Sequence, residues 1–69
     1  MNMIKVVDSS IISAVGYENH KLEVWLNTGK KYQYSPVPET VFKNFLKAPS
    51  KGIFFNRNVK PHYDCKPLN

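Results

Sequence analysis

The segment that most constrains the fold covers residues 21–35, where two strand-like stretches flank a glycine turn. In the first stretch every second side chain is apolar, and these positions are Leu22, Val24 and Leu26. A period of two is typical of a β-strand with one buried face. Glycine adopts the positive φ that tight turns need, so Asn27–Gly29 predicts a β-hairpin whose second strand covers residues 30–35.

The length of this turn decides which face the two tyrosines of the second strand occupy. A three-residue turn, which we favour, places Val24 opposite Tyr32 and directs Tyr32 and Tyr34 into the core. Trp25 then lies opposite Lys31 on the other face. A two-residue turn would place both tyrosines on the face of Trp25, because a slip of one residue reverses every side chain.

The remaining chain predicts one more strand and two helical segments. Residues 11–17 are rich in β-branched side chains and favour a strand, with polar turns on either side. Pro38 suits the start of a helix, which Pro49 ends, and an apolar stripe lies between them. Ser50 can cap a short second helix that runs through Asn56.

Together these elements predict a single α+β domain over residues 1–69, with an ordered core from about residue 4 to residue 64. We expect a small antiparallel three-stranded meander, with a fourth short strand left open. One or two helices pack on one face, and an extended C-terminal tail follows. The core positions are expected to be Ile12, Val15, Leu22, Val24, Leu26, Tyr32, Tyr34, Val41, Phe42, Phe45, Leu46, Phe54 and Val59.

Charge is unevenly placed along the chain, whose net charge is +5. Residues 1–29 hold two basic and three acidic side chains, whereas residues 30–69 hold eight basic and two acidic ones. A basic half favours an anionic partner, with nucleic acid first among the candidates. A solvated basic surface that keeps a small protein soluble explains the same asymmetry.

Cellular location is indicated by the lone cysteine and by the hydropathy of the chain. Cys65 cannot form an internal disulfide, which fits a reducing compartment. Neither a signal-peptide pattern nor an apolar run of about 20 residues is visible. We therefore expect a soluble cytoplasmic protein without membrane contact.

The residues that catalysis or metal binding would need are scattered. The serines have no identifiable histidine partner, and the five carboxylates show no pairing. His62 and Cys65 lack the paired spacing of a zinc site. We expect no enzymatic activity, no catalytic residues, no metal and no cofactor.

Basic and aromatic side chains provide the chemistry that holds single-stranded RNA or DNA. Cations contact the phosphates, and aromatic rings stack on the bases. The candidate nucleic-acid-binding residues are Trp25, Lys30, Lys31, Lys51, Arg57, Lys60 and Tyr63.

Trp25 is the most informative of these candidates, because it interrupts a polar strand face. Either it stacks on a base, or it is covered by a terminal segment while Lys31 packs on its ring. Both interpretations stay open at the level of sequence.

A protein-binding module is the alternative function. The edge strands of a meander can pair with a strand of another protein. Trp25 and the Phe54–Phe55 pair could supply a binding hot spot. The partner would be a large acidic assembly such as the transcription or translation machinery.

Several short motifs, in order, resemble the KTSC domain, named for the C-terminal segment of some lysyl-tRNA synthetases. The resemblance covers residues 6–63. It rests on Ser9-Ser10-x-Ile12, Gly16-Tyr17, Tyr32-x-Tyr34, Val37-Pro38 and Ser50-x-Gly52-x-Phe54-x-Asn56. Tyr-x-Tyr is the hallmark of that family. This chain departs from it at Val59-Lys60, where the family often has Ile-Arg, and at Phe42, where it often has tyrosine. The resemblance implies a bacterial or phage domain, alone or appended to larger proteins, for which RNA binding has been suggested.

Overall fold

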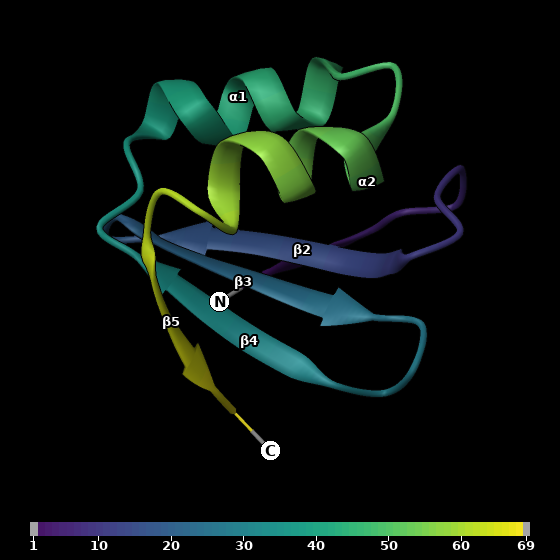
Figure 1. Ribbon diagram of the computed structural model, residues 1–69, viewed down its shortest axis with the longest axis horizontal. Helices are drawn as coiled ribbons and strands as arrows, with labels where there is room; N and C mark the ends of the chain where they lie inside the picture. Colours follow the sequence, from purple (N-terminus) through teal and green to yellow (C-terminus); the bar gives the residue numbers. More distant parts are fainter. Residues whose placement is uncertain (1, 69) are drawn as a thin grey trace.

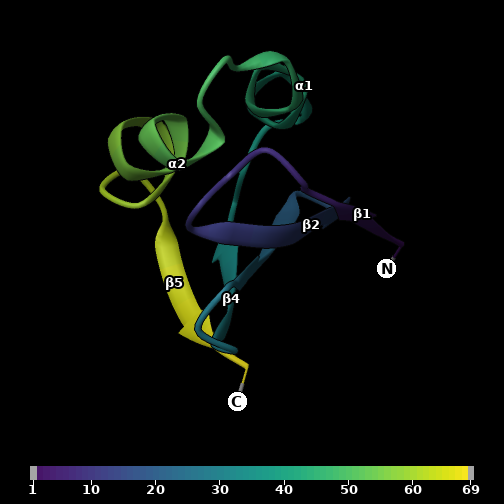
Figure 2. The same cartoon turned by 90° about the vertical axis from the view of Figure 1, so that its right-hand side faces the viewer.

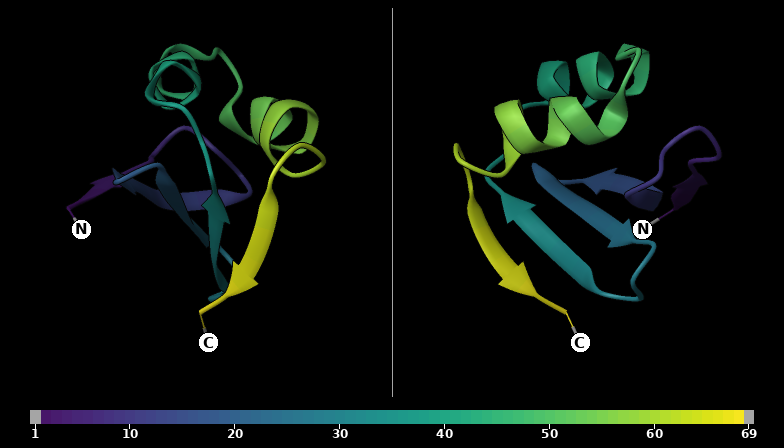
Figure 3. Two further views of the ribbon diagram at one scale, coloured as in Figure 1. Left: turned by 90° about the vertical axis from the view of Figure 1, so that its left-hand side faces the viewer. Right: turned by 45° about the vertical axis from the view of Figure 1, so that its right-hand side comes forward.

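The computed structural model describes residues 2–68 as a sheet layer and a helical layer (Figure 1). Both helical segments lie on the same side of a curved sheet, as the turned views show (Figures 2 and 3). The strands pair in chain order as one antiparallel five-stranded sheet. The elements are β1 (Met3–Lys5), β2 (Ile12–Glu18), β3 (Lys21–Leu26), β4 (Lys31–Ser35), α1 (Glu39–Lys47), α2 (Lys51–Phe54), the π-helix η1 (Phe55–Val59) and β5 (Asp64–Pro67).

The β3–β4 hairpin has the three-residue turn that the sequence favours. The Gly29 amide donates to the Leu26 carbonyl over 3.0 Å, and Gly29 has a φ of 94°. Val24 lies opposite Tyr32, and Trp25 lies opposite Lys31. The predicted register is therefore confirmed. Tyr34 is buried and Tyr32 is partly buried against the core.

The α+β class is confirmed, but the sheet has five strands, whereas three were predicted with a fourth left open. The segment that we expected to be an extended C-terminal tail contains β5, which pairs with β4. All four of its residues are exposed, so it shows no alternation of apolar and polar side chains. At the other edge, β1 has only three residues and pairs with β2. Both edge strands are too short or too polar for a periodicity signal. The end residues 1 and 69 of the predicted domain lie outside the described residues.

The second helical segment continues beyond the predicted end at Asn56. The Lys60 amide donates to the Phe55 carbonyl over 2.9 Å, a bond that spans five residues and defines the wider π-helical turn. Phe55 and Val59 both reach the core in this turn. The prediction missed Phe55 as a core residue.

The core lies between the sheet and the helical layer. Fully buried side chains from both layers meet there, and they include Phe45 of α1, Val24 of β3 and Val59 of η1. Ring pairs join the layers: Tyr17 of β2 stacks on Phe42 of α1 with ring centroids 5.0 Å apart. Val6 and Val37 are also buried, although they lie outside regular elements and the pattern did not predict them. Within the described residues, no helix has the length and apolar character needed to cross a bilayer.

Candidate nucleic-acid interface

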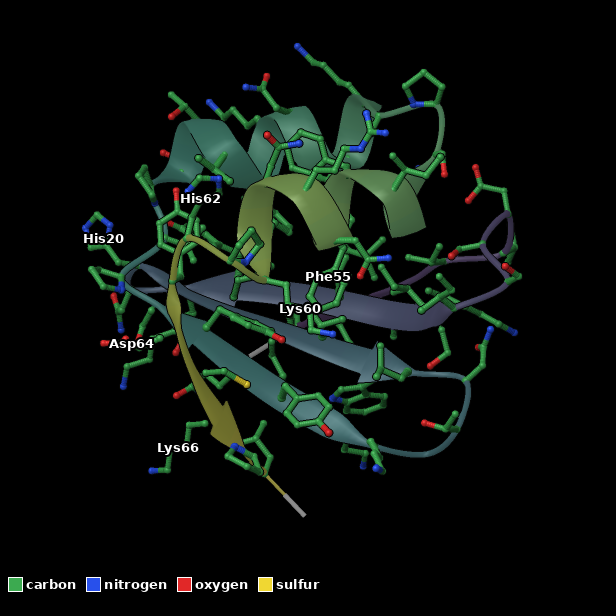
Figure 4. All side chains as sticks on the ribbon, in the orientation of Figure 1. His20, Phe55, Lys60, His62, Asp64 and Lys66 are labelled. Carbon is green, nitrogen blue, oxygen red and sulfur yellow. The ribbon has the colours of Figure 1, made fainter. Side chains whose placement is uncertain are left out.

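The seven candidate residues lie on both layers of the domain. Trp25, Lys30 and Lys31 come from β3, the following turn and β4. The other four come from the helical layer and the segment after it. Figure 4 shows Lys60 on the sheet side of the helical layer, pointing away from α1. The structure therefore does not gather the seven residues on one surface.

Trp25 contacts neighbours on its own sheet face. The Lys31 ammonium lies 4.2 Å from the centre of the indole ring, a cation–π contact. The indole N–H donates to the carboxylate of Glu23. A base that stacked on this side of the ring would have to displace Lys31, and the carboxylate would repel a nearby phosphate. This cluster is called the tryptophan cluster below, and it consists of Trp25, Lys31 and Glu23.

Lys51 and its neighbours hold the start of α2 in place. The Lys51 ammonium lies 3.7 Å from the Asp8 carboxylate, and its side chain is only 15% exposed. The Ser50 hydroxyl accepts a hydrogen bond from the Ile53 amide. A Cβ at Gly52 would lie 3.1 Å from the side chain of Ile11, so glycine allows α2 to approach the chain that leads into β2.

Arg57 and Tyr63 line a groove between α1 and the α2–η1 segment. One hollow of about 320 Å³ is lined by Ala48, Pro49, Ser50, Ile53, Phe54, Arg57 and Asn58. A second hollow of about 480 Å³ is lined by Val41, Asn44, Phe54, Asn58, His62 and Tyr63. Because the two hollows share Phe54 and Asn58, they form one continuous surface, called the helix groove below.

The helix groove combines apolar, amide and cationic groups. Within residues 2–68, none of the side chains that line either hollow is acidic. Ile53 is 56% exposed at the groove, although it is a large apolar residue. Lys47 is exposed on α1 and follows Asn44 by about one helical turn. The arrangement offers aromatic and apolar surface next to positive charge.

Sequence reasoning named Arg57 and Tyr63 but missed Asn44, Asn58 and His62. A weak signal was present in α1, because Val41, Asn44 and Ala48 recur at a spacing that places them on one side of a helix. The other groove wall could not be foreseen, since it depends on how η1 lies against α1.

Two comparisons identify the family. The KTSC domain model matches residues 8–63, which is most of the chain. The chain belongs to the KTSC domain family. The crystal structure of the KTSC domain protein YPO2434 from Yersinia pestis superposes with a TM-score of 0.93 at 36% identity, and the match covers 99% of this chain and 97% of that one.

A curated relative is similar to this chain over a small part of its own, much greater length. The lysine–tRNA ligase of Nostoc punctiforme is 31% identical over 64 residues, which is 90% of this chain and 11% of the ligase. The KTSC domain described here thus spans about a tenth of the length of that relative.

Proposed function

We propose that this KTSC domain is a non-enzymatic cytoplasmic binding domain for RNA or another single-stranded nucleic acid, and that the helix groove is its contact surface. The main support for the proposal is the composition of the helix groove. Aromatic side chains, amides and Arg57 lie together there, and no acidic side chain lines it within the described part of the chain.

Electrostatics favours a polyanion at this groove. The chain carries a net charge of +5, and Arg57 lies in the smaller hollow. Lys47 is exposed on α1 and precedes Ala48, which lines the smaller hollow. Cations that contact phosphates release condensed counterions, which gives affinity without sequence preference and makes binding sensitive to salt.

Ring surfaces provide the second part of the chemistry. Phe54 and Tyr63 are partly buried, so each packs on the core and still lines the groove. Phe54 is held in place by stacking on the buried Phe45 ring, at a centroid distance of 5.6 Å. Rigidly held rings are suited to stacking on unpaired bases.

The curated relative is consistent with an RNA partner. A lysine–tRNA ligase acts on tRNA, as its name states, and a region similar to this chain makes up part of it. We extend this association to the present chain as part of the proposal.

The test is an NMR titration of the labelled domain with short single-stranded RNA at two salt concentrations. We expect salt-sensitive shifts at the helix groove, centred on Arg57 and Tyr63. The double variant Lys47→Glu/Arg57→Glu should weaken binding at least about tenfold and flatten the salt dependence.

A variant with the same change in charge serves as the control. Lys5→Glu/Lys66→Glu also lowers the net charge from +5 to +1, but its substitutions lie on the edge strands β1 and β5. Equal weakening by both double variants would show that affinity follows net charge alone, and would overturn the groove as the contact surface. A flat titration at low salt would overturn nucleic-acid binding, and turnover by a purified nuclease-free sample would overturn the non-enzymatic assignment.

A protein partner is the second candidate, and one observation favours it. The edge strand β1 carries Ile4, which is 45% exposed, and Val7 nearby is 85% exposed. An apolar strand edge can accept a strand from a larger acidic partner, such as the transcription or translation machinery. Capture of such a partner should survive nuclease treatment and be lost in Ile4→Lys. Capture that disappears with nuclease would count against it.

A further inference from the structure

The larger hollow of the helix groove has the chemistry of a site for one unpaired base. Two carboxamides face it from separate elements, Asn44 from α1 and Asn58 from η1. The rings of Phe54 and Tyr63 supply its aromatic surface. Its volume of about 480 Å³ lies in the range of small-molecule binding sites.

The carboxamides are available to a ligand. Within residues 2–68, no intramolecular hydrogen bond engages the side chain of Asn44 or Asn58. A carboxamide presents one donor and one acceptor side by side. This pair matches the N6 donor and N7 acceptor of adenine, for which asparagine is the usual bidentate partner. Unpaired adenine offers a second such pair, N6 with N1, so both carboxamides can bind one base, whereas unpaired uracil has a single N–H donor and can bind only one of them in this way.

The smaller hollow offers a binding contact for the phosphate that accompanies a base. Arg57 lines that hollow, and the two hollows meet at Phe54 and Asn58. A nucleotide with its base in the larger hollow can therefore direct its phosphate toward the guanidinium. Arginine suits this contact because its planar fork binds phosphate through two hydrogen bonds.

We propose that the larger hollow binds one unpaired adenine base. Asn44 and Asn58 hydrogen-bond to its edge, Tyr63 stacks on its face and Arg57 contacts the adjacent phosphate. This inference rests on the proposed function and specifies what the groove recognises. The complex is non-covalent. The phosphate contact makes its affinity depend on salt, and the amide contacts make its affinity depend on which base is bound.

The test compares oligo-A with oligo-U of equal length at one salt concentration, by fluorescence anisotropy on the full chain. We expect oligo-A to bind about tenfold more tightly. Asn44→Leu and Asn58→Leu should reduce the affinity for oligo-A to that for oligo-U, and leave oligo-U nearly unchanged. Tyr63→Leu should weaken both oligonucleotides, whereas Tyr63→Phe keeps the ring and should bind like the wild type.

Asn56→Leu is the matched control. Asn56 is exposed on the same π-helix but lines neither hollow, so its replacement should leave both affinities unchanged. Amide NMR spectra of each variant establish that it is folded. Equal affinity for oligo-A and oligo-U, or no loss in either asparagine variant, would overturn the base site and leave nucleic-acid binding standing. No salt-sensitive binding to either oligonucleotide would overturn both proposals.

Discussion

The tryptophan cluster and the helix groove both hold aromatic and polar side chains, but they differ in what those side chains contact. In the tryptophan cluster, Lys31 lies over the indole ring of Trp25 and Glu23 accepts its N–H. In the groove, Asn44 and Asn58 make no side-chain hydrogen bond within residues 2–68. Side chains that satisfy one another stabilise the fold, whereas side chains held open on a rigid surface can bind a ligand.

Trp25→Ala tests the structural role of the tryptophan cluster and has the largest expected effect. It removes a half-buried ring, a cation–π contact and a hydrogen bond, so we expect the free energy of unfolding to fall by about 2 kcal/mol. Urea denaturation measures this loss. RNA affinity of the folded variant should be unchanged, in contrast to Tyr63→Leu. A Trp25→Ala variant of normal stability and reduced RNA affinity would reverse the roles of the two regions.

The difference between the regions also explains what could be predicted from the sequence. The β3–β4 hairpin was predicted to the register because alternation and the Gly29 turn are local signals. The strand β5 was missed because its pairing with β4 is the only thing that makes it a strand, and its exposed residues carry no pattern. Local signals thus determine the centre of the sheet, and non-local pairing determines its edges.

The candidate site follows the same division. Basic and aromatic residue types selected Arg57 and Tyr63 from composition alone. The same criteria selected Trp25 and Lys31, which contact each other. Residue type cannot distinguish these cases, because the outcome depends on which neighbours the fold supplies. Asn44 and Asn58 become candidates only when α1 and η1 are seen to line one hollow.

Alkaline pH provides a second test, directed at the buried Tyr34 of β4. Burial, followed by a hydrogen bond with the Cys65 side chain, raises the pKa of Tyr34 above its ordinary value of about 10. The unfolded chain therefore loses this proton first. The stability that the Tyr34 hydroxyl contributes is fully present below about pH 10 and is lost as the pH rises above it. The slope for one such group is at most about 1.4 kcal/mol per pH unit.

Tyr34→Phe isolates this contribution, because the variant and the wild type share every other side chain. Phenylalanine preserves the edge contact with Phe55, whose ring centroid lies 5.4 Å away. Urea denaturation at pH 9 and pH 11 should show a smaller loss of stability for the variant than for the wild type, by about 1 kcal/mol. Identical losses would show that the Tyr34 hydroxyl ionises as easily in the folded chain as in the unfolded one.

Removing the Lys51–Asp8 ion pair has the smallest expected effect on stability. It also tests whether the nucleic-acid surface extends beyond the groove. Lys51 was a candidate for phosphate binding, yet its ammonium lies 3.7 Å from the Asp8 carboxylate, which is 62% exposed. A pair with one partner open to solvent contributes about 0.5 kcal/mol, so we expect a coupling of that size between Lys51→Ala and Asp8→Ala. A double-mutant cycle with Asp8→Ala measures the coupling directly.

RNA affinity should stay at the wild-type level in Lys51→Ala, because the Lys51 ammonium is already paired with the Asp8 carboxylate. A clear drop in RNA affinity would extend the nucleic-acid surface from the groove to the start of α2, and would mean that Asp8 competes with the phosphate for the same ammonium.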